Sequence, residues 1–118
     1  MAVRHYRELV AWQRAMELVA DVYGITHRFP AGELYGLTNQ VRRAAVSIPS
    51  NIAEGQGRGV GREFAHHLRI AAGSLNEVET QLLIAERLGY AHASDVARLL
   101  DLSAEVGRVI NGLLKSLK

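Results

Sequence analysis

Apolar residues recur at alternating spacings of three and four in four blocks of the chain, and this rhythm constrains the fold more than any other feature of the sequence. The third block is the most regular, with apolar positions at Phe64, Leu68, Ala71, Leu75, Val78, Leu82 and Ala85. Such spacing places one apolar stripe along an α-helix and favours packing against partner helices. The alternation typical of β-strands is absent from the sequence. We therefore predict an all-α fold.

The first block contains two neighbouring apolar stripes. The main stripe is Leu9, Trp12, Met16, Val19 and Tyr23, and the second is Ala11, Ala15, Leu18, Val22 and Ile25. The helix should end near Arg28, because Pro30 disfavours helical geometry at the residue before it.

The second block spans residues 33–54, with a core face made of Leu34, Leu37, Val41, Ala45, Ile48 and Ile52. Pro49 lies inside it and should kink the helix, because a proline removes one backbone hydrogen bond and crowds the preceding turn. Its small neighbours would let another helix approach closely. We expect four glycines to end this helix and form the connection: Gly55, Gly57, Gly59 and Gly61.

The fourth block keeps the same rhythm, at Val96, Leu99, Ser103, Val106, Ile110, Leu113 and Leu117. Gly89 supplies a stop for the third helix, and Ser94 is the expected N-cap of the fourth. Four helices with short connections predict one domain, residues 1–118, folded as an up-down-up-down four-helix bundle with its second helix kinked at Pro49.

The first and fourth helices carry more apolar residues than one buried stripe requires. The surplus is Val10, Leu18, Val22 and Ile25 on the first helix and Leu100, Val109 and Leu114 on the fourth. A helix that is apolar over more than about 100° of its circumference needs cover on two sides. We therefore expect a homo-oligomer.

Several classes of function are disfavoured by composition and spacing. The chain has no cysteine, which excludes disulfides and thiolate chemistry, and no apolar run of the roughly 20 residues needed to cross a membrane. The charged, amphipathic pattern after Arg7 also leads us to expect no signal peptide. Glu63 and His66 form one Glu-x-x-His motif, but the second copy that a di-metal bundle needs is missing. The run from Gly55 to Gly61 lacks both standard phosphate-loop patterns. We expect a cytoplasmic protein that is not an enzyme and has no metal, cofactor or small-molecule substrate.

Charge is unevenly distributed, although the net charge is only +2. Residues 28–69 hold six arginines against three glutamates, whereas residues 70–105 hold two arginines against six acids. Arg58, Arg62, His66 and Arg69 would line one face of the third helix if that helix reaches back to Arg58.

Two interpretations of the arginines stay open. Together with Arg42 and Arg43 of the second helix, Arg58, Arg62 and Arg69 could contact nucleic-acid phosphates. Alternatively, these arginines could serve ion pairs between helices and subunit interfaces.

Three stretches resemble a known family. They are the opening Glu8-Leu9-Val10-Ala11-Trp12-Gln13, the central run from Leu34 to Gly55 that contains Arg43-Ala44-Ala45-Val46-Ser47-Ile48-Pro49-Ser50-Asn51-Ile52-Ala53-Glu54-Gly55, and the third-helix run from Gly73 to Leu82. Together they are similar to the four-helix bundle proteins named after intervening sequences in bacterial 23S ribosomal RNA genes.

The resemblance implies a ring-shaped homopentamer, and kinship with accessory proteins of diversity-generating retroelements that bind reverse transcriptase and nucleic acid. It thus suggests an RNA or nucleoprotein partner. It also assigns structural motif positions, which in this chain are Ser47, Pro49, Asn51, Glu54, Gly55 and Glu77.

Overall fold

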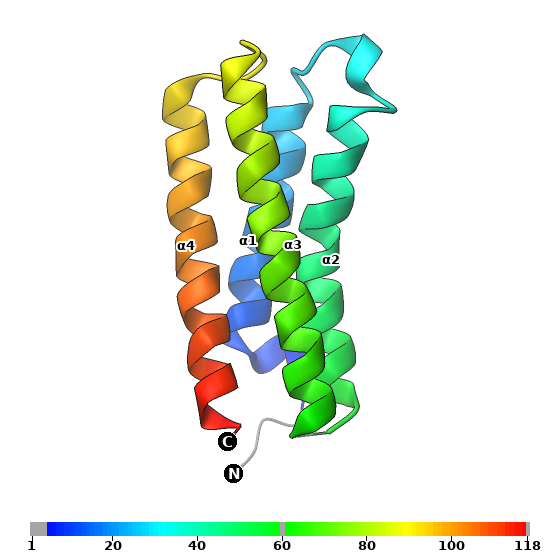
Figure 1. The fold of residues 1–118 in the computed structure, drawn as a ribbon, viewed down its shortest axis with the longest axis vertical. Coiled ribbons are helices and arrows are strands. Elements are labelled where there is room, and N and C mark those ends of the chain that lie inside the picture. The colour runs from blue at the N-terminus through cyan, green and yellow to red at the C-terminus, as the bar shows by residue number, and fades with distance from the viewer. Residues whose placement is uncertain (1–4, 60, 118) are drawn as a thin grey trace.

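Four long helices follow one another in the predicted order and pack as an up-down bundle (Figure 1). The computed structural model describes residues 5–59 and 61–117, so Val60 of the glycine-rich connection and both ends of the predicted domain lie outside the described residues. The long helices are α1 (Val10–Thr26), α2 (Leu37–Gly57), α3 (Arg62–Arg87) and α4 (Ala93–Ser116), and two short 3-10 helices, η1 (Tyr6–Glu8) and η2 (Ala31–Glu33), precede α1 and α2. α1 and α3 run in one direction, and α2 and α4 run in the other (Figure 1).

The core is mostly aliphatic, and its stripe on α1 is not the one predicted as the main stripe. The buried residues of the helix include the second stripe, Ala11, Ala15, Leu18, Val22 and Ile25. Met16 and Tyr23 of the predicted main stripe are instead exposed. Two alanines in the buried stripe let α1 approach its neighbours closely, whereas Tyr and Trp keep a polar tip that favours the surface.

The expected surplus of apolar surface is therefore only partly the one observed. Val10 is exposed as predicted, but Leu18, Val22 and Ile25 are buried. On α4, the predicted Leu100, Val109 and Leu114 are partly buried and pack against the core.

The second helix begins later and ends later than predicted. It starts at Leu37, so Leu34 lies in the connection before it and is exposed rather than part of the core. Gly55 and Gly57 belong to the helix and do not form the connection. α2 continues through Pro49 as one helix. The predicted kink at Pro49 stays a prediction.

The turn between α3 and α4 confirms one predicted signal and corrects another. Gly89 has a φ of +79°, a left-handed value that glycine adopts without steric cost, and it follows the last turn of α3. Ser94 is not the N-cap of α4, because the helix already begins at Ala93 after His92.

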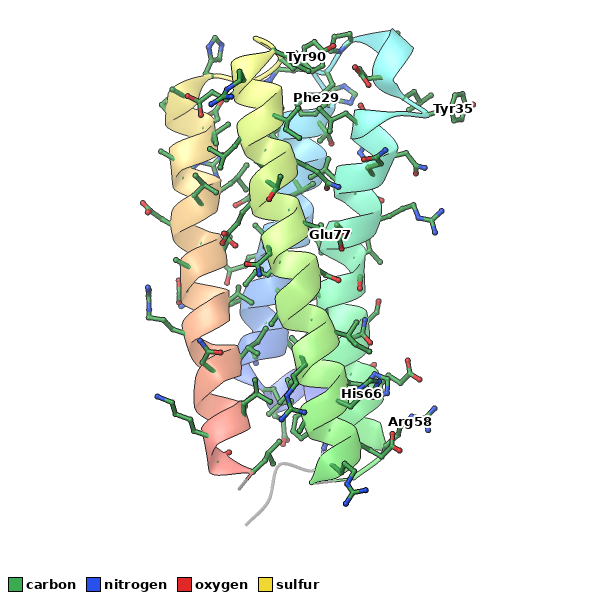
Figure 2. All side chains as sticks on the ribbon, viewed as in Figure 1. Phe29, Tyr35, Arg58, His66, Glu77 and Tyr90 are labelled. Atoms are coloured by element: carbon green, nitrogen blue, oxygen red, sulfur yellow. The ribbon has the colours of Figure 1, made fainter. Side chains whose placement is uncertain are left out.

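The N-cap residue of α2 is Gly36, which has no side chain to cap the helix, and the carboxylate of Glu33 caps it instead. Oε1 of Glu33 accepts the backbone N–H of Leu37 at 3.0 Å, and Oε2 accepts the hydroxyl of Tyr90 at 2.9 Å. These two bonds, the backbone bond first, lower the pKa of Glu33, and the bond to Glu33 raises the pKa of Tyr90. The Tyr90 ring lies 5.8 Å from that of Phe29 at the same end of the bundle (Figure 2).

Ion pairs connect α4 to α1 and to the residues just after α1. Arg14 pairs with Glu105 at 2.9 Å, Asp21 with Arg98 at 3.1 Å, and Arg28 with Asp95 at 3.1 Å. The order of these pairs follows the antiparallel arrangement of the two helices. Within residues 5–59 and 61–117, no helix is long and apolar enough to cross a membrane.

Candidate functional site

A groove runs along the outer surface between α1 and α2. Its wider part, about 750 Å³, is lined by Tyr23, Leu34, Tyr35, Thr38, Asn39, Arg42, Arg43, Val46 and Ser47. A second part, about 350 Å³, is lined by Tyr6, Trp12, Met16, Val19, Val46, Pro49, Ser50 and Ala53. Val46 belongs to both parts, so the two form one continuous surface, called here the α1/α2 groove.

Aromatic side chains are concentrated in this groove. Of the seven aromatic residues in the chain, four line it: Tyr6, Trp12, Tyr23 and Tyr35. Two others, Phe29 and Phe64, are buried in the core. Tyr35 is 90% exposed and points away from the bundle (Figure 2), and Met16 and Val46 are 43% and 40% exposed. Tyr, Trp, Met and Arg are the residue types enriched at protein interfaces.

Arg42 is fixed in the groove by contacts with α1. Its Nε donates to Oγ1 of Thr26 at 2.8 Å, and its guanidinium lies 4.5 Å from the centre of the Tyr23 ring. Thr26 is buried and donates its hydroxyl to the carbonyl of Val22. Arg42 therefore joins two helices, while the neighbouring Arg43 is exposed.

Three motif residues of α2, namely Ser47, Asn51 and Gly55, contact α3. The hydroxyls of Ser47 and Ser74 are 2.8 Å apart. The Asn51 amide donates to the carbonyl of Ser47 at 2.9 Å, and its oxygen lies 3.0 Å from Nδ1 of His67. At Gly55, an added Cβ would lie 2.6 Å from the Cβ of His67. This seam is thus a closely packed contact between helices.

Pro49 is buried within α2 and lines the α1/α2 groove. Glu77 is exposed on α3 and borders a shallow polar depression that Arg43 also lines. Figure 2 shows Glu77 near the middle of the bundle.

The five arginines predicted to contact phosphates are spread over α2, its C-cap and α3. Arg58 caps the C-terminus of α2 and pairs with Glu54 at 3.1 Å, so the predicted line from Arg58 along the third helix is wrong. α3 begins only at Arg62, and Arg62 and Arg69 are exposed on it. Arg58 and His66 lie at the lower end of the bundle in Figure 2, far from Tyr35.

Sequence reasoning missed the groove because it assigned the aromatic stripe of the first helix to the core. The signal was present in the two parallel stripes, because they cover more of the helix than the bundle interior can bury. Tyr35 and Val46 carried no signal of their own, since their place depends on how α2 begins and packs.

Comparison with known proteins gives a consistent result. A family model described as "23S rRNA-intervening sequence protein" matches residues 7–112. A solved structure from Bacteroides thetaiotaomicron, described as a protein with unknown function from the S23 ribosomal protein family, has a TM-score of 0.81 and 22% sequence identity. The match covers 90% of this chain and 99% of that one, and it shows that the two share a fold. No curated protein matches the chain.

Proposed function

The chain belongs to the 23S rRNA-intervening sequence protein family, and from this premise we propose that it is a non-enzymatic, homo-oligomeric scaffold whose subunits associate through the α1/α2 groove. The observation that carries the proposal is the gathering of Tyr6, Trp12, Tyr23 and Tyr35 along the groove, where Tyr23, Tyr35, Met16 and Val46 are exposed. Large apolar and aromatic side chains left together on a surface mark sites of protein interaction.

A second copy of the chain is the proposed occupant of the groove. Of the four aromatic residues of the groove, only Trp12 packs against the core, and Tyr23 and Tyr35 are exposed. Their burial against another subunit would remove apolar area from water at about 25 cal/mol per Å² before the costs of association. The arginines of the groove would then be interface residues.

The test is the molar mass in solution, measured by light scattering coupled to size exclusion at micromolar concentration. We expect an oligomer for the wild-type chain and a folded monomer for Val46→Glu, because a carboxylate in the groove would lose its hydration in the interface. The matched control is Val10→Glu, at a position that is 51% exposed and outside the groove. A wild-type monomer, or an unchanged oligomer in Val46→Glu, would contradict the proposal.

A second candidate function is contact with RNA or a nucleoprotein, carried by Arg43, Arg62 and Arg69. All three are exposed, and none forms an ion pair within the described part of the chain. Free guanidinium groups bind phosphates in two-pronged geometry, and the binding weakens as salt rises.

Fluorescence anisotropy of a labelled RNA across a salt series tests this second function. Replacing Arg43, Arg62 and Arg69 with Ala should weaken binding and flatten the salt dependence. Arg108→Ala, at an exposed position on α4, is the control and should bind like the wild type. Absence of binding at low salt, or equal binding by all variants, would exclude RNA contact through these arginines.

A further inference from the structure

A polar depression of about 330 Å³ lies along the seam between α2 and α3. The hydroxyls of Ser47 and Ser74, which both line it, are 2.8 Å apart. Because α2 and α3 run in opposite directions (Figure 1), residues before Ser47 on α2 lie across from residues after Ser74 on α3. The other polar side chains of this surface, called here the α2/α3 depression, follow that order: Gln40 and Arg43 from α2, and Glu77 and Gln81 from α3.

Arg43 and Glu77 bring opposite charges to the two sides of the α2/α3 depression, yet they do not pair with each other. Both side chains are exposed, and neither forms an ion pair within residues 5–59 and 61–117. A guanidinium and a carboxylate that line one depression without pairing offer a cationic and an anionic contact at once. This arrangement favours a ligand that carries both charges.

The two glutamines of the depression also lack partners in the part of the chain that the structure describes. Neither side-chain amide forms a hydrogen bond there, and Oε1 of Gln81 is buried without a donor. Buried polar atoms in folded proteins are almost always hydrogen-bonded, and an unpaired one lowers stability. Because no hydrogen bond holds the Gln81 amide, it can turn about its last side-chain torsion and accept a donor from a ligand.

The pair of serines supplies one further donor. Oγ of Ser47 accepts from the Asn51 amide at 3.0 Å and shares one hydrogen bond with Oγ of Ser74. Two hydroxyls carry two hydrogens, and the bond between them uses one, whichever serine donates it. The other hydroxyl hydrogen has no acceptor among the described residues, so it adds a donor to the depression.

We infer that the α2/α3 depression binds a free α-amino acid with a polar side chain, as a ligand that is held and not converted. Its carboxylate contacts Arg43, its ammonium group contacts Glu77, and its side chain forms hydrogen bonds with Gln40 and Gln81. Glutamine represents this class of ligand, because its amide both donates and accepts. The inference goes beyond the proposed function and does not depend on the oligomeric state of the chain.

The charges of the depression favour an amino acid over a simple ion. A phosphate bound to Arg43 would be repelled by Glu77, and a cation bound to Glu77 would be repelled by Arg43. A neutral molecule would leave both charges without a counter-charge. The volume of the depression lies near the lower end of the range of ligand pockets, about 300–1,000 Å³, so the ligand is small and its Kd should be millimolar.

Saturation-transfer NMR on the full chain tests the inference, because it detects millimolar binding to a protein of any size. Glutamine is titrated beside two analogues. One is glutaramic acid, which lacks the ammonium group, and the other is 4-aminobutyramide, which lacks the carboxylate. Inorganic phosphate, titrated as a competitor, reports binding of an anion alone.

The variants are Glu77→Gln and Arg43→Gln, with Glu63→Gln and Arg69→Gln as matched controls at exposed positions of α3 outside the depression. Loss of one charged contact should weaken the binding of glutamine at least about tenfold, whereas the controls should bind it as the wild type does. Each variant should also erase one preference. Glu77→Gln should bind glutamine and glutaramic acid equally, and Arg43→Gln should bind glutamine and 4-aminobutyramide equally.

Three results would overturn the inference. They are the absence of saturable glutamine binding by the wild type in the millimolar range, equal weakening in the control variants, and phosphate competition that strengthens in Glu77→Gln. Arg43 and Ser47 also line the α1/α2 groove, whereas Glu77 does not, so the molar mass of each variant is measured in parallel. An oligomer that does not bind glutamine would overturn this inference alone, and a monomer that binds it would overturn only the proposed function.

Discussion

At Gly55 the backbone of α2 passes so close to α3 that the position has no room for a side chain. A Cβ there would lie 2.6 Å from the Cβ of His67 and 3.1 Å from the ring of Phe64. We expect Gly55→Ala to lower the free energy of unfolding by about 1–3 kcal/mol, because the helices must separate to accept the methyl group.

Gly73 provides the matched control for Gly55. It lies within α3, is exposed, and has nothing within 4 Å of an added Cβ. Gly73→Ala should raise the free energy of unfolding by about 0.5–1 kcal/mol, since alanine is the better helix former. Urea titration measures both variants, and equal effects of the two substitutions would contradict the close approach at Gly55.

The Glu33 carboxylate should make the stability of the folded protein depend on pH. Its folded pKa lies below the ordinary value of 4.5, because it accepts bonds from Leu37 and Tyr90. The stability from these bonds is therefore fully present above pH 4.5 and is lost as the pH falls through the lower folded pKa. Glu33→Gln should be less stable at pH 7 and should lose less stability than the wild type during acidification below that value.

Urea midpoints measured between pH 7 and pH 3 test the prediction for Glu33. Tyr90→Phe removes one of the two hydrogen bonds to Glu33. Its acid profile should therefore lie between those of the wild type and Glu33→Gln. Superimposable acid profiles of the wild type and Glu33→Gln would show that the carboxylate does not carry this dependence.

At the scale of a helix, the rhythm of apolar residues predicted each long element but not the orientation of α1 about its own axis. Both of its stripes satisfy the spacing of three and four, and the larger residues Trp12, Met16 and Tyr23 suggested the wrong one. Tertiary packing decided the outcome, because the stripe with Ala11 and Ala15 permits closer contact with neighbouring helices. Four residues of the other stripe line the groove: Trp12, Met16, Val19 and Tyr23.

The ends of the helices depend on contacts between residues that are far apart in the sequence. Glu33 caps α2 from the preceding 3-10 helix, with Tyr90 as a partner 57 positions away. The N-cap predicted for α4 at Ser94 was wrong, since His92 holds that position and local preference alone does not fix where a helix begins.

The contact between α1 and α4 carries a prediction at this scale. Asp21 and Arg98 are 3.1 Å apart, with side chains that are 39% and 57% exposed. Arg98→Asp should lower the free energy of unfolding by about 0.5–1 kcal/mol, since two carboxylates would then face each other. The exchange Asp21→Arg with Arg98→Asp should recover about half of that loss or more.

A double-mutant cycle in urea isolates the pair, and salt provides the control. At about 1 M salt the coupling should become small, because the charges are exposed and screened. A coupling that is absent at low salt would show that register depends on apolar packing alone.

At the scale of the whole molecule, the fold was predictable because its four periodic blocks admit few alternatives. The interaction surface was not predictable, because it consists of the apolar residues that the core leaves exposed. Which residues these are depends on how the helices pack. The arginines illustrate this point. Arg42 and Arg43 are adjacent in sequence, yet Arg42 is held by Thr26 and Tyr23 while Arg43 is exposed.

Association through the groove predicts that thermal stability depends on protein concentration. A ligand that binds only the folded state stabilises it by mass action, and a partner subunit is such a ligand. For a domain of this size, a tenfold rise in concentration should raise the Tm of the wild type by about 2–6 °C. Val46→Glu should unfold at a Tm that does not change with concentration, whereas Val10→Glu should keep the wild-type dependence. Calorimetry from about 5 to 500 µM measures the effect, and a constant Tm for the wild type over that range would mean that folding and association are not linked.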